Sequence, residues 1–277
     1  MMRLNRKDMT KRVIAFSIVA FLGLLAFIPL YWMVITAIKP PALTLRFPPE
    51  LFPTNPTIQN FASLFQRPTI WRWTLNSGIV AGTVTIVQLL FCAMAGYSLA
   101  KKQFPGKNFL FGMYISSMMI PKQVTLVPLY ILISEFGMIN TYQALILPSI
   151  ATPFGVFLMR QFMITLPSEV IEAARIDGAS EVRTFFSIIL PMTKPALAVL
   201  GIFTFVGEWN DFLWPLIVTN TPNMMTLQAG LARLQEEVPL QHSLLMAGAA
   251  FAAIPMIVVF FAFSRYFLKG ITIGAIK

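Results

Sequence analysis

Charged residues, cysteine and histidine are all scarce in this chain of 277 residues. Only 12% of the residues are Asp, Glu, Lys or Arg, whereas soluble domains contain about 25%. The one cysteine, Cys92, excludes an intrachain disulfide. The one histidine, His242, is expected at a membrane interface rather than as a ligand or base. No cluster of metal ligands and no nucleophile–base pair stands out, so neither a metal site nor a catalytic residue is predicted.

The phosphate-binding loop of nucleotide hydrolases is also missing. That loop has the form G-x-x-x-x-G-K-[ST] and holds phosphates against its backbone N–H groups. The only Gly-Lys pair is Gly106-Lys107, and Lys101 and Asn108 stand where the motif requires Gly and Ser or Thr. The chain is therefore expected to bind no cofactor. If it takes part in an ATP-driven process, ATP and Mg bind to another protein.

Apolar residues are abundant instead, at 57% of the chain with a mean hydropathy of +0.73. This composition indicates an all-α integral membrane protein. Because a helix needs about 20 mostly apolar residues to cross a ~30 Å hydrocarbon core, six spans are expected. The first is too long, and too bulky at its end, for a cleaved signal peptide. The six ranges are 13–35, 75–100, 108–133 (interrupted by Pro121 and Lys122), 142–162, 195–218 and 243–267.

The distribution of charge predicts the topology. With six spans, both termini lie on one side, which holds 15 of the 21 Lys and Arg residues and 5 of the 11 acids. That side carries the whole net charge of +10, so it is expected to face the cytoplasm. A nucleic-acid partner is then not needed to explain the basic balance. The expected parts are a cytoplasmic N-terminus (1–12), a membrane domain (13–267) containing a long cytoplasmic loop (163–194), and a cytoplasmic tail (268–277).

The loop between the fourth and fifth spans has the pattern of a helix, a glycine turn and a second helix. Ser168 is a suitable N-cap for the first helix, and Glu169 complements the helix dipole in the first turn. Gly178 suits the position just after the helix end, and Ser180 can cap the second helix. Spacings of i, i+3, i+4 and i+7 predict one shared face in each helix, made of Val170, Ala173, Ala174 and Asp177 in the first and Val182, Phe185, Phe186 and Ile189 in the second. Such a loop either rests on the membrane interface and joins the two spans or packs in a protein groove, and the alanine-rich face favours the groove.

Several motifs run through this loop and beyond it. They are Glu172-Ala173-Ala174, then Asp177-Gly178-Ala179, then Ile188-Ile189-Leu190-Pro191, followed by the Trp-Asn-Asp segment within 208–216 and the tail 269–277. The loop motifs resemble the EAA loop of bacterial binding-protein-dependent ABC importers. The later segment and the tail are similar to a permease of the sugar branch of that family, typified by the maltose transporter. The resemblance covers essentially the whole chain.

The resemblance implies a fold, partners and site residues. The fold is the transmembrane domain of a type I ABC importer, in which the EAA loop is a coupling helix. The partners are a second, homologous permease, two cytoplasmic ATPases, an extracytoplasmic solute-binding protein and the lipid of a prokaryotic cytoplasmic membrane. The residues implied to couple this chain to the ATPase are Glu172, Ala173, Ala174, Asp177, Gly178 and, in the tail, Lys277. The cargo implied is an oligosaccharide, sugar derivative, polyol or glycerol phosphate.

Polar residues inside the spans suggest where a pathway runs. Such residues are costly in lipid and usually face a bundle interior or a cavity. The candidates are Gln88, Gln123, Glu208, Asn210 and Asp211. They either face a solute or satisfy one another between helices, and the sequence does not decide between these readings. An ion-coupled secondary transporter remains the alternative function, because Glu208 and Asp211 are acids inside a span.

Overall fold

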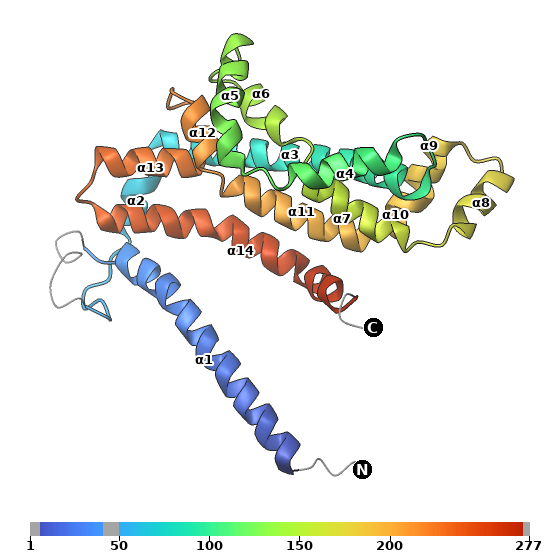
Figure 1. Ribbon diagram of the computed structural model, residues 1–277. Coiled ribbons are helices and arrows are strands. Elements are labelled where there is room, and N and C mark those ends of the chain that lie inside the picture. The colour runs from blue at the N-terminus through green and yellow to red at the C-terminus, as the bar shows by residue number, and fades with distance from the viewer. Residues whose placement is uncertain (1–5, 41–49, 274–277) are drawn as a thin grey trace. The chain divides into compact units, whose positions relative to one another are not determined.

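The computed structural model describes residues 6–40 and 50–273, and all regular elements in these residues are helical (Figure 1). The helices are α1 (Arg6–Ala37), α2 (Gln59–Phe65), α3 (Pro68–Lys101), α4 (Lys107–Ser117), α5 (Lys122–Glu135), α6 (Tyr142–Ile146), η2 (Leu147–Ser149), α7 (Pro153–Ile164), α8 (Glu169–Ile176), α9 (Glu181–Thr184), η3 (Phe185–Ile189), α10 (Leu190–Met192), α11 (Lys194–Trp209), α12 (Leu213–Val218), α13 (Leu227–Glu237) and α14 (His242–Ile273). The chain forms two compact units.

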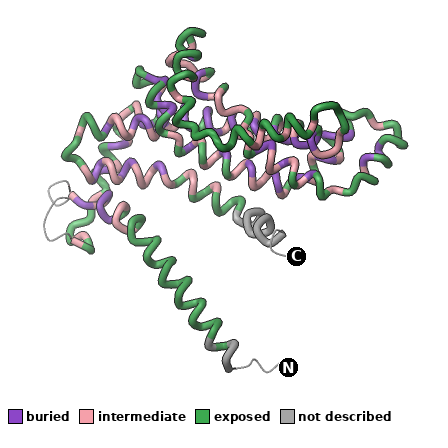
Figure 2. The backbone as a smooth tube through the Cα atoms, in the orientation of Figure 1, coloured by how far each residue is buried: buried purple, intermediate pink, exposed green. Residues whose placement is uncertain are grey.

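The first unit comprises Met1–Arg67 and Leu231–Ala253. Most side chains of α1 between residues 11 and 30 are exposed, and they are almost all apolar (Figure 2). Lipid is the expected surrounding of such a helix. After α1 the chain is fastened by polar contacts, because the Asn60 amide donates to the backbone carbonyls of Ala37 at 2.7 Å and Lys39 at 2.8 Å.

The second unit comprises Pro68–Gly230 and Ile254–Lys277, and its long axis is α3. α7 and α11 pack along α3, and their buried side chains form one apolar core. The approach of α3 to α7 is close, since a Cβ atom on Gly96 would lie 2.7 Å from Cβ of Met159 and 2.9 Å from the backbone N of Arg160. Figure 1 shows α8 and α9 at one end of this bundle and α5, α6 and α12 towards the other.

Only some of the expected spans are continuous helices. Three helical stretches are long and apolar enough to cross a membrane alone, namely Lys11–Ala37, Pro68–Lys101 and His242–Phe263. Three further candidates are bent pairs, with angles of 99° between α4 and α5, 42° between Tyr142–Ser149 and α7, and 78° between Glu181–Met192 and α11. Up to six spans result if each bent pair crosses once.

The expected fifth span, 195–218, is not a single continuous helix. α11 ends at Trp209, and residues 210–212 separate it from α12. Asn210 and Asp211 occupy the break, and such residues compete with helical hydrogen bonds through their own side chains. The break in the third candidate lies at residues 118–121, where Pro121 was expected to interrupt the helix.

Residues 222–230, between α12 and the start of α13, are fixed to the N-terminal end of α3. Asn76 is fully buried, and its amide donates to the carbonyls of Asn223 at 2.9 Å and Met225 at 2.8 Å. The indole of Trp73 donates to the Pro222 carbonyl at 2.7 Å. We call this set of neutral contacts, made by Trp73 and Asn76, the amide anchor. It continues into α13, where Gly230 lies against the Trp73 ring.

Candidate functional site

The loop that resembles an EAA loop folds into α8, a tight turn and α9. α8 ends with two backbone bonds, from Gly178 N to Arg175 O at 3.0 Å and from Ala179 N to Ala174 O at 2.9 Å. Gly178 has φ +74°, so the pair forms a Schellman motif and the predicted glycine turn is confirmed. Ser180 caps α9 as expected, with its Oγ accepting from Arg183 N at 3.3 Å.

Ser168 does not cap α8 with its side chain. Its backbone carbonyl accepts from Ile171 N and Glu172 N, and its hydroxyl lies 3.4 Å from the Lys101 ammonium. The expected side-chain cap is therefore wrong. Two glutamates, Glu169 and Glu172, still lie in the first turn of α8, where they complement the partial positive charge of the helix start.

α8 also turns a different face to the rest of the chain than expected. Ile171 and Ala174 are its buried residues. The opposite face is exposed and consists of Glu169, Glu172, Ala173 and Ile176, again at i, i+3, i+4 and i+7. Ile176 is 87% exposed, which is costly for a large apolar side chain in water. We call these four residues the α8 outer face. Of the two alanines predicted to contact a partner, only Ala173 lies on it.

The second helix departs from the predicted face because its winding changes. Phe185 and Ile189 are buried, whereas Val182 is 68% and Phe186 46% exposed. Residues 185–189 form a π-helical turn, which holds more residues per turn than an α-helix and so shifts the register of a 3.6-residue repeat. Ile171, Phe185 and Ile189 join the same apolar core as α3, α7 and α11. The loop is thus packed onto the bundle.

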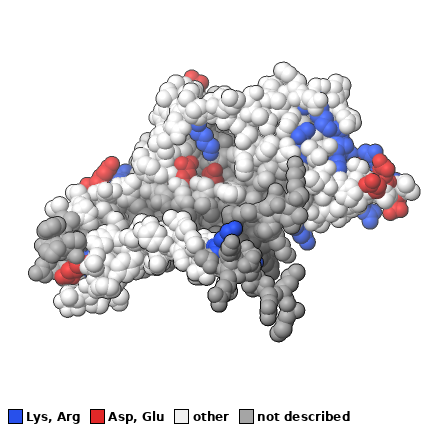
Figure 3. Space-filling model, turned by 60° about the horizontal axis from the view of Figure 1, so that its bottom comes forward, with Lys and Arg blue, Asp and Glu red and all other residues white. Residues whose placement is uncertain are grey.

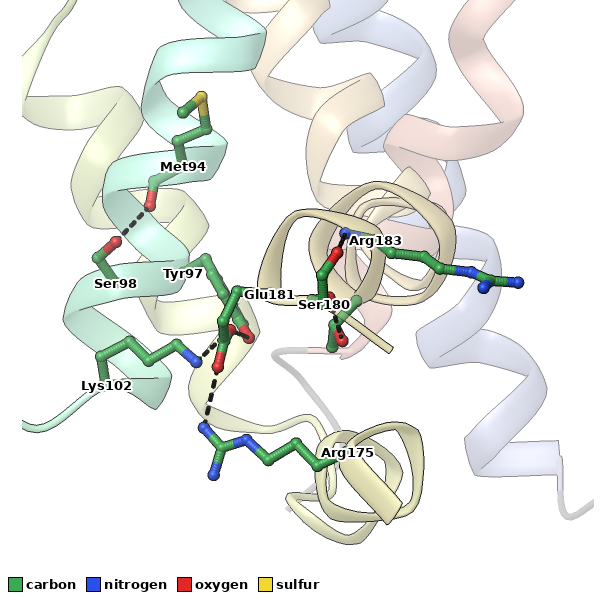
Figure 4. A network of polar contacts seen from close by, with 9 residues as sticks. Met94, Tyr97, Ser98, Lys102, Arg175, Ser180, Glu181 and Arg183 are labelled. Atoms are coloured by element: carbon green, nitrogen blue, oxygen red, sulfur yellow. Dashed lines mark hydrogen bonds and ion pairs between the residues drawn. The ribbon is translucent and has the colours of Figure 1, made fainter. Parts of the chain in front are cut away.

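Polar contacts add to this packing at the C-terminal end of α3 (Figure 4). The Glu181 carboxylate of α9 forms an ion pair with Lys102, accepts from Arg175 at 3.1 Å and accepts from the Tyr97 hydroxyl at 3.3 Å. The pKa of the Glu181 carboxyl lies below its usual value, chiefly because the Lys102 ammonium donates to the carboxylate. Burial acts in the opposite direction, and the hydrogen bond from Arg175 lowers the pKa further. Lys101 donates to the Leu166 carbonyl just before α8. In Figure 3 the densest gathering of charged side chains lies over this end of the unit.

A second candidate site is a cavity of about 540 Å³ in the second unit. Three helix breaks reach it, namely those between α4 and α5, between η2 and α7, and between α11 and α12. A cavity of this size suits a small ligand. Irregular backbone at membrane depth is tolerated only inside protein or along a water-filled cavity. Three helix breaks that meet at one cavity therefore fit a pathway for a solute. The lining includes Gln88, Lys122, Gln123, Thr152, Phe154, Phe203, Thr204, Glu208, Asp211 and Trp214.

Several polar candidates in this cavity have partners within the chain. Gln88 donates to the Ser149 carbonyl at 2.8 Å and accepts from the Thr204 hydroxyl, so it satisfies backbone at the η2–α7 break. The Asp211 carboxylate accepts from backbone N–H groups at the start of α12. These two residues therefore support the broken helices as well as lining the space. The threonines and aromatic rings of the lining were not singled out from the sequence, because their types are ordinary within apolar spans.

One predicted residue of the described chain, Asn210, lies apart from these sites. Asn210 does not line the cavity, and its amide donates to the Val206 carbonyl at 3.0 Å. Lys277 lies outside the described residues. Among the residues that the structure describes, no three His, Cys, Asp or Glu side chains come together as a metal site.

Comparisons with known proteins identify the class of protein that this fold and these sites define. Residues 92–273 match the family described as "Binding-protein-dependent transport system inner membrane component", and the chain belongs to that family. Its members are transmembrane permease subunits of ABC importers, so the chain is a transport subunit and not an enzyme. The alternative of an ion-coupled secondary transporter is not favoured.

Particular relatives cover nearly the whole chain. The arabinooligosaccharides transport system permease protein AraQ of Halalkalibacterium halodurans is 37% identical over 93% of this chain and 94% of the relative. The sn-glycerol-3-phosphate transport system permease protein UgpE of Salmonella typhi is 33% identical over 88% and 89%. A chain of a bacterial ABC transporter involved in the import of the acidic polysaccharide alginate matches in fold, with a TM-score of 0.84 at 18% identity over 96% and 100%. The fold is that of a type I ABC importer permease.

Proposed function

We propose that this chain is one permease of an importer that carries a carbohydrate or related solute into a prokaryotic cell, driven by ATP hydrolysis in a separate subunit. The observation that carries the proposal is the near full-length similarity to permeases for arabinooligosaccharides and sn-glycerol 3-phosphate. The cargo is then an oligosaccharide, sugar derivative, polyol or glycerol phosphate. The partners are a second, homologous permease, two ATPases and an extracytoplasmic solute-binding protein.

The proposed topology has six spans within the membrane domain, residues 13–267. The N-terminus (1–12) and the tail (268–277) both lie in the cytoplasm. The bias of Lys and Arg towards one side supports it. The bent pairs α4–α5 and Tyr142–Ser149 with α7 supply the third and fourth spans, and α11 begins the fifth, while Glu181–Met192 stays in the cytoplasmic loop. Cysteine accessibility tests this directly, since the native Cys92 is buried. A cysteine at Gln103, just after α3, is expected to react with membrane-impermeant maleimide only in inverted vesicles.

The α8 outer face is the proposed contact with the ATPase. A thin face with an alanine, two carboxylates and an exposed Ile176 suits a groove that has a basic rim and an apolar floor. Ala174 is buried in this chain, and its role is then to let α8 lie close to its own bundle. Asp177 ends α8 and Gly178 makes the turn, while Lys277 approaches the ATPase from the tail.

Replacing Glu172 with Lys reverses charge on the outer face without touching the core. Co-purification of the ATPase is expected to fall several-fold, while the chain still inserts into the membrane. Glu135→Lys is the matched control, because Glu135 is also exposed but lies at the end of α5. An undiminished complex in the Glu172→Lys variant removes Glu172 from the contact.

Replacing Gly178 with Val tests the turn. A β-branched residue disfavours positive φ, with a cost of about 1–2 kcal/mol for the left-handed conformation. We expect ATP hydrolysis to continue while uptake falls, because α8 no longer leaves the bundle at the same angle. Gly112→Val in α4 is the control, since a Cβ there meets nothing within 4 Å and its φ is not positive. Normal uptake by the Gly178→Val variant contradicts the proposed role of the turn.

The cavity at the three helix breaks is the proposed part of the pathway that this subunit contributes. Glu208, Asp211, Gln88 and Gln123 offer hydrogen-bond partners for hydroxyl groups, and Phe154, Phe203 and Trp214 offer aromatic faces. The cargo itself is best identified through the solute-binding protein. Native mass spectrometry of that protein, purified with its bound ligand, gives the mass of the solute. A mass outside the carbohydrate, polyol and sugar-phosphate range contradicts the proposed cargo class.

A further inference from the structure

Two adjacent lysines at the end of α3 hold the two ends of α8. Lys101 donates to the carbonyl of Leu166, three residues before α8 begins. Lys102 pairs with Glu181, which lies five residues after α8 ends and also accepts from Arg175 on α8 itself. Figure 4 shows the Glu181 carboxylate between Lys102 on one side and Arg175 on the other. Entry and exit of α8 are therefore both attached to one helix end.

Hydrophobic packing alone gives α8 a weak attachment. Ile171 and Ala174 are its two buried side chains, and an alanine removes little apolar surface from water. The segment after α8 passes through Gly178, where a Cβ would meet nothing within 4 Å, so no packing against the bundle supports the turn at that position. A helix anchored by one isoleucine and followed by a glycine turn needs a further constraint to move as one body with the bundle.

We propose that Glu181 is a positioning residue that clamps α8 to the end of α3, so that a displacement of α8 is transmitted to α3 instead of being absorbed at the Gly178 turn. The inference rests on the proposed function, in which an ATPase moves α8. Glu181 does not touch the ATPase in this scheme, because its carboxylate is turned towards α3 and Arg175. Its charge matters, since one carboxylate holds two cations and a hydroxyl.

The alternative is that Glu181 and Arg175 form an ordinary solvated ion pair that does not affect the position of α8. Glu181 and Arg175 are 54% and 58% exposed, and exposed pairs contribute little on average. What distinguishes the clamp is its geometry, because the three donors come from two different elements, α3 and α8, while the acceptor belongs to α9. Loss of the acceptor releases both elements from α9. The two readings therefore predict different behaviour of α8.

The test uses the complete transporter, with its second permease and ATPases, in lipid nanodiscs. Amide hydrogen exchange of residues 165–180 is compared between wild type and Glu181→Gln, which keeps the size of the side chain and removes its charge. Exchange in this segment is expected to rise roughly two- to fivefold, the range that an exposed ion pair corresponds to. Glu135→Gln is the matched control, because Glu135 is exposed and lies on α5. Unchanged exchange in Glu181→Gln overturns the clamp.

A charge swap separates positioning from a general loss of structure. Lys102→Glu combined with Glu181→Lys restores one ion pair, although Arg175 then faces a lysine. Exchange is expected to return part of the way to the wild-type value, and further when Arg175→Glu is added. No recovery in either combination counts against the clamp.

The functional readout is uptake per ATP hydrolysed, with arabinotriose and sn-glycerol 3-phosphate as the probes and the solute-binding protein added. Glu181→Gln is expected to lower this ratio while the ATPase still co-purifies, in contrast to Glu172→Lys. An unchanged ratio in a transporting complex contradicts the inference. If the wild-type complex carries neither probe, these two solutes are excluded as cargo, and the amide exchange result alone decides the clamp.

Discussion

The two ends of α3 are fastened to their neighbours by different chemistry. At the N-terminal end, the amide anchor of Trp73 and Asn76 is buried and neutral, with donor–acceptor distances of 2.7–2.9 Å. At the C-terminal end, the contacts of Lys101 and Lys102 are ionic or charge-assisted, and Glu181 is more than half exposed. The contacts at the N-terminal end are therefore mainly buried and neutral, with one exposed charged donor, Arg72 Nε, at 3.1 Å from the Asn223 carbonyl, whereas those at the C-terminal end are charged and partly exposed to water.

This difference has energetic consequences. A buried amide that loses a partner leaves polar groups without water, which costs about 1–3 kcal/mol for each group. An exposed ion pair is compensated by water when it breaks, and its contribution is typically only about 0.2–1 kcal/mol. We infer that α3 is held firmly at its N-terminal end, which we call the fixed end, and more loosely at its C-terminal end, which we call the adjustable end. A subunit that must move at α8 benefits from this arrangement.

The largest effect is expected for Gly230→Ala, at the fixed end. A Cβ atom there would lie 2.2 Å from the Trp73 ring, and Trp73 is itself held by its bond to Pro222. Overpacking a filled site typically costs about 1–3 kcal/mol, and this contact is closer than most, so the upper end is expected. The measurement is thermal unfolding of the purified chain in detergent, followed by tryptophan fluorescence.

Gly82→Ala is the control for that substitution. Gly82 also lies in a helix, α3, but a Cβ there meets nothing within 4 Å. The alanine is expected to be neutral or to stabilise by up to about 1 kcal/mol, because glycine is the more flexible residue in the unfolded chain. Equal effects of the two substitutions contradict the packing of α13 onto Trp73.

The amide anchor also marks the limit of what could be predicted from the sequence. Hydropathy located the three long helices that are apolar enough to cross a membrane, and Gly178 and Ser180 were recognisable because turn and cap chemistry is local. The anchor joins Asn76 to residues 223 and 225, far along the chain, and one buried asparagine has no local signature. Nothing local in the sequence therefore indicated that residues 222–225 bond to α3.

The same reasoning explains the errors in the coupling loop. Periodicity assumes a regular winding, and the π-helical turn at 185–189 breaks that assumption. For α8, both Val170 and Ile171 are apolar, so the sequence allowed two faces, and packing against the bundle selected the one with Ile171 and Ala174. Glu181 looked like one charge among many, because its partners Tyr97 and Lys102 lie on a distant helix.

A second, smaller effect at the fixed end is expected for Asn76→Leu. Leucine is similar in size, but the carbonyls of Asn223 and Met225 and the Tyr142 hydroxyl each lose a partner. The Asn223 carbonyl keeps its bond from Arg72 Nε at 3.1 Å, and leucine buries more apolar surface than asparagine. We therefore expect a loss of about 2 kcal/mol in the free energy of unfolding, less than the sum over three unpaired groups. Asn108→Leu is the control, because Asn108 is exposed at the start of α4. If both variants unfold at the wild-type temperature, the anchor contributes nothing to stability.

The smallest effect, and the one specific to the adjustable end, is a dependence of α8 protection on pH. The pKa of Glu181 lies below its ordinary value of 4.5, chiefly because Lys102 hydrogen-bonds to it, with Arg175 and Tyr97 as further partners. A lowered carboxyl pKa means that the contact is complete above pH 4.5 and is lost as the pH falls through the folded-state value. Amide exchange of residues 165–180 in wild type, corrected for intrinsic rates, is therefore expected to approach that of Glu181→Gln as the solution is acidified below this range. Comparing the two proteins at each pH cancels the protonation of Glu169 and Glu172, which both contain. A constant difference between the two proteins down to pH values well below 4.5 would mean that the Glu181 charge does not hold α8. The amide anchor serves as an internal control. Neither Trp73 nor Asn76 titrates, so amide exchange around them should not change over the same pH interval.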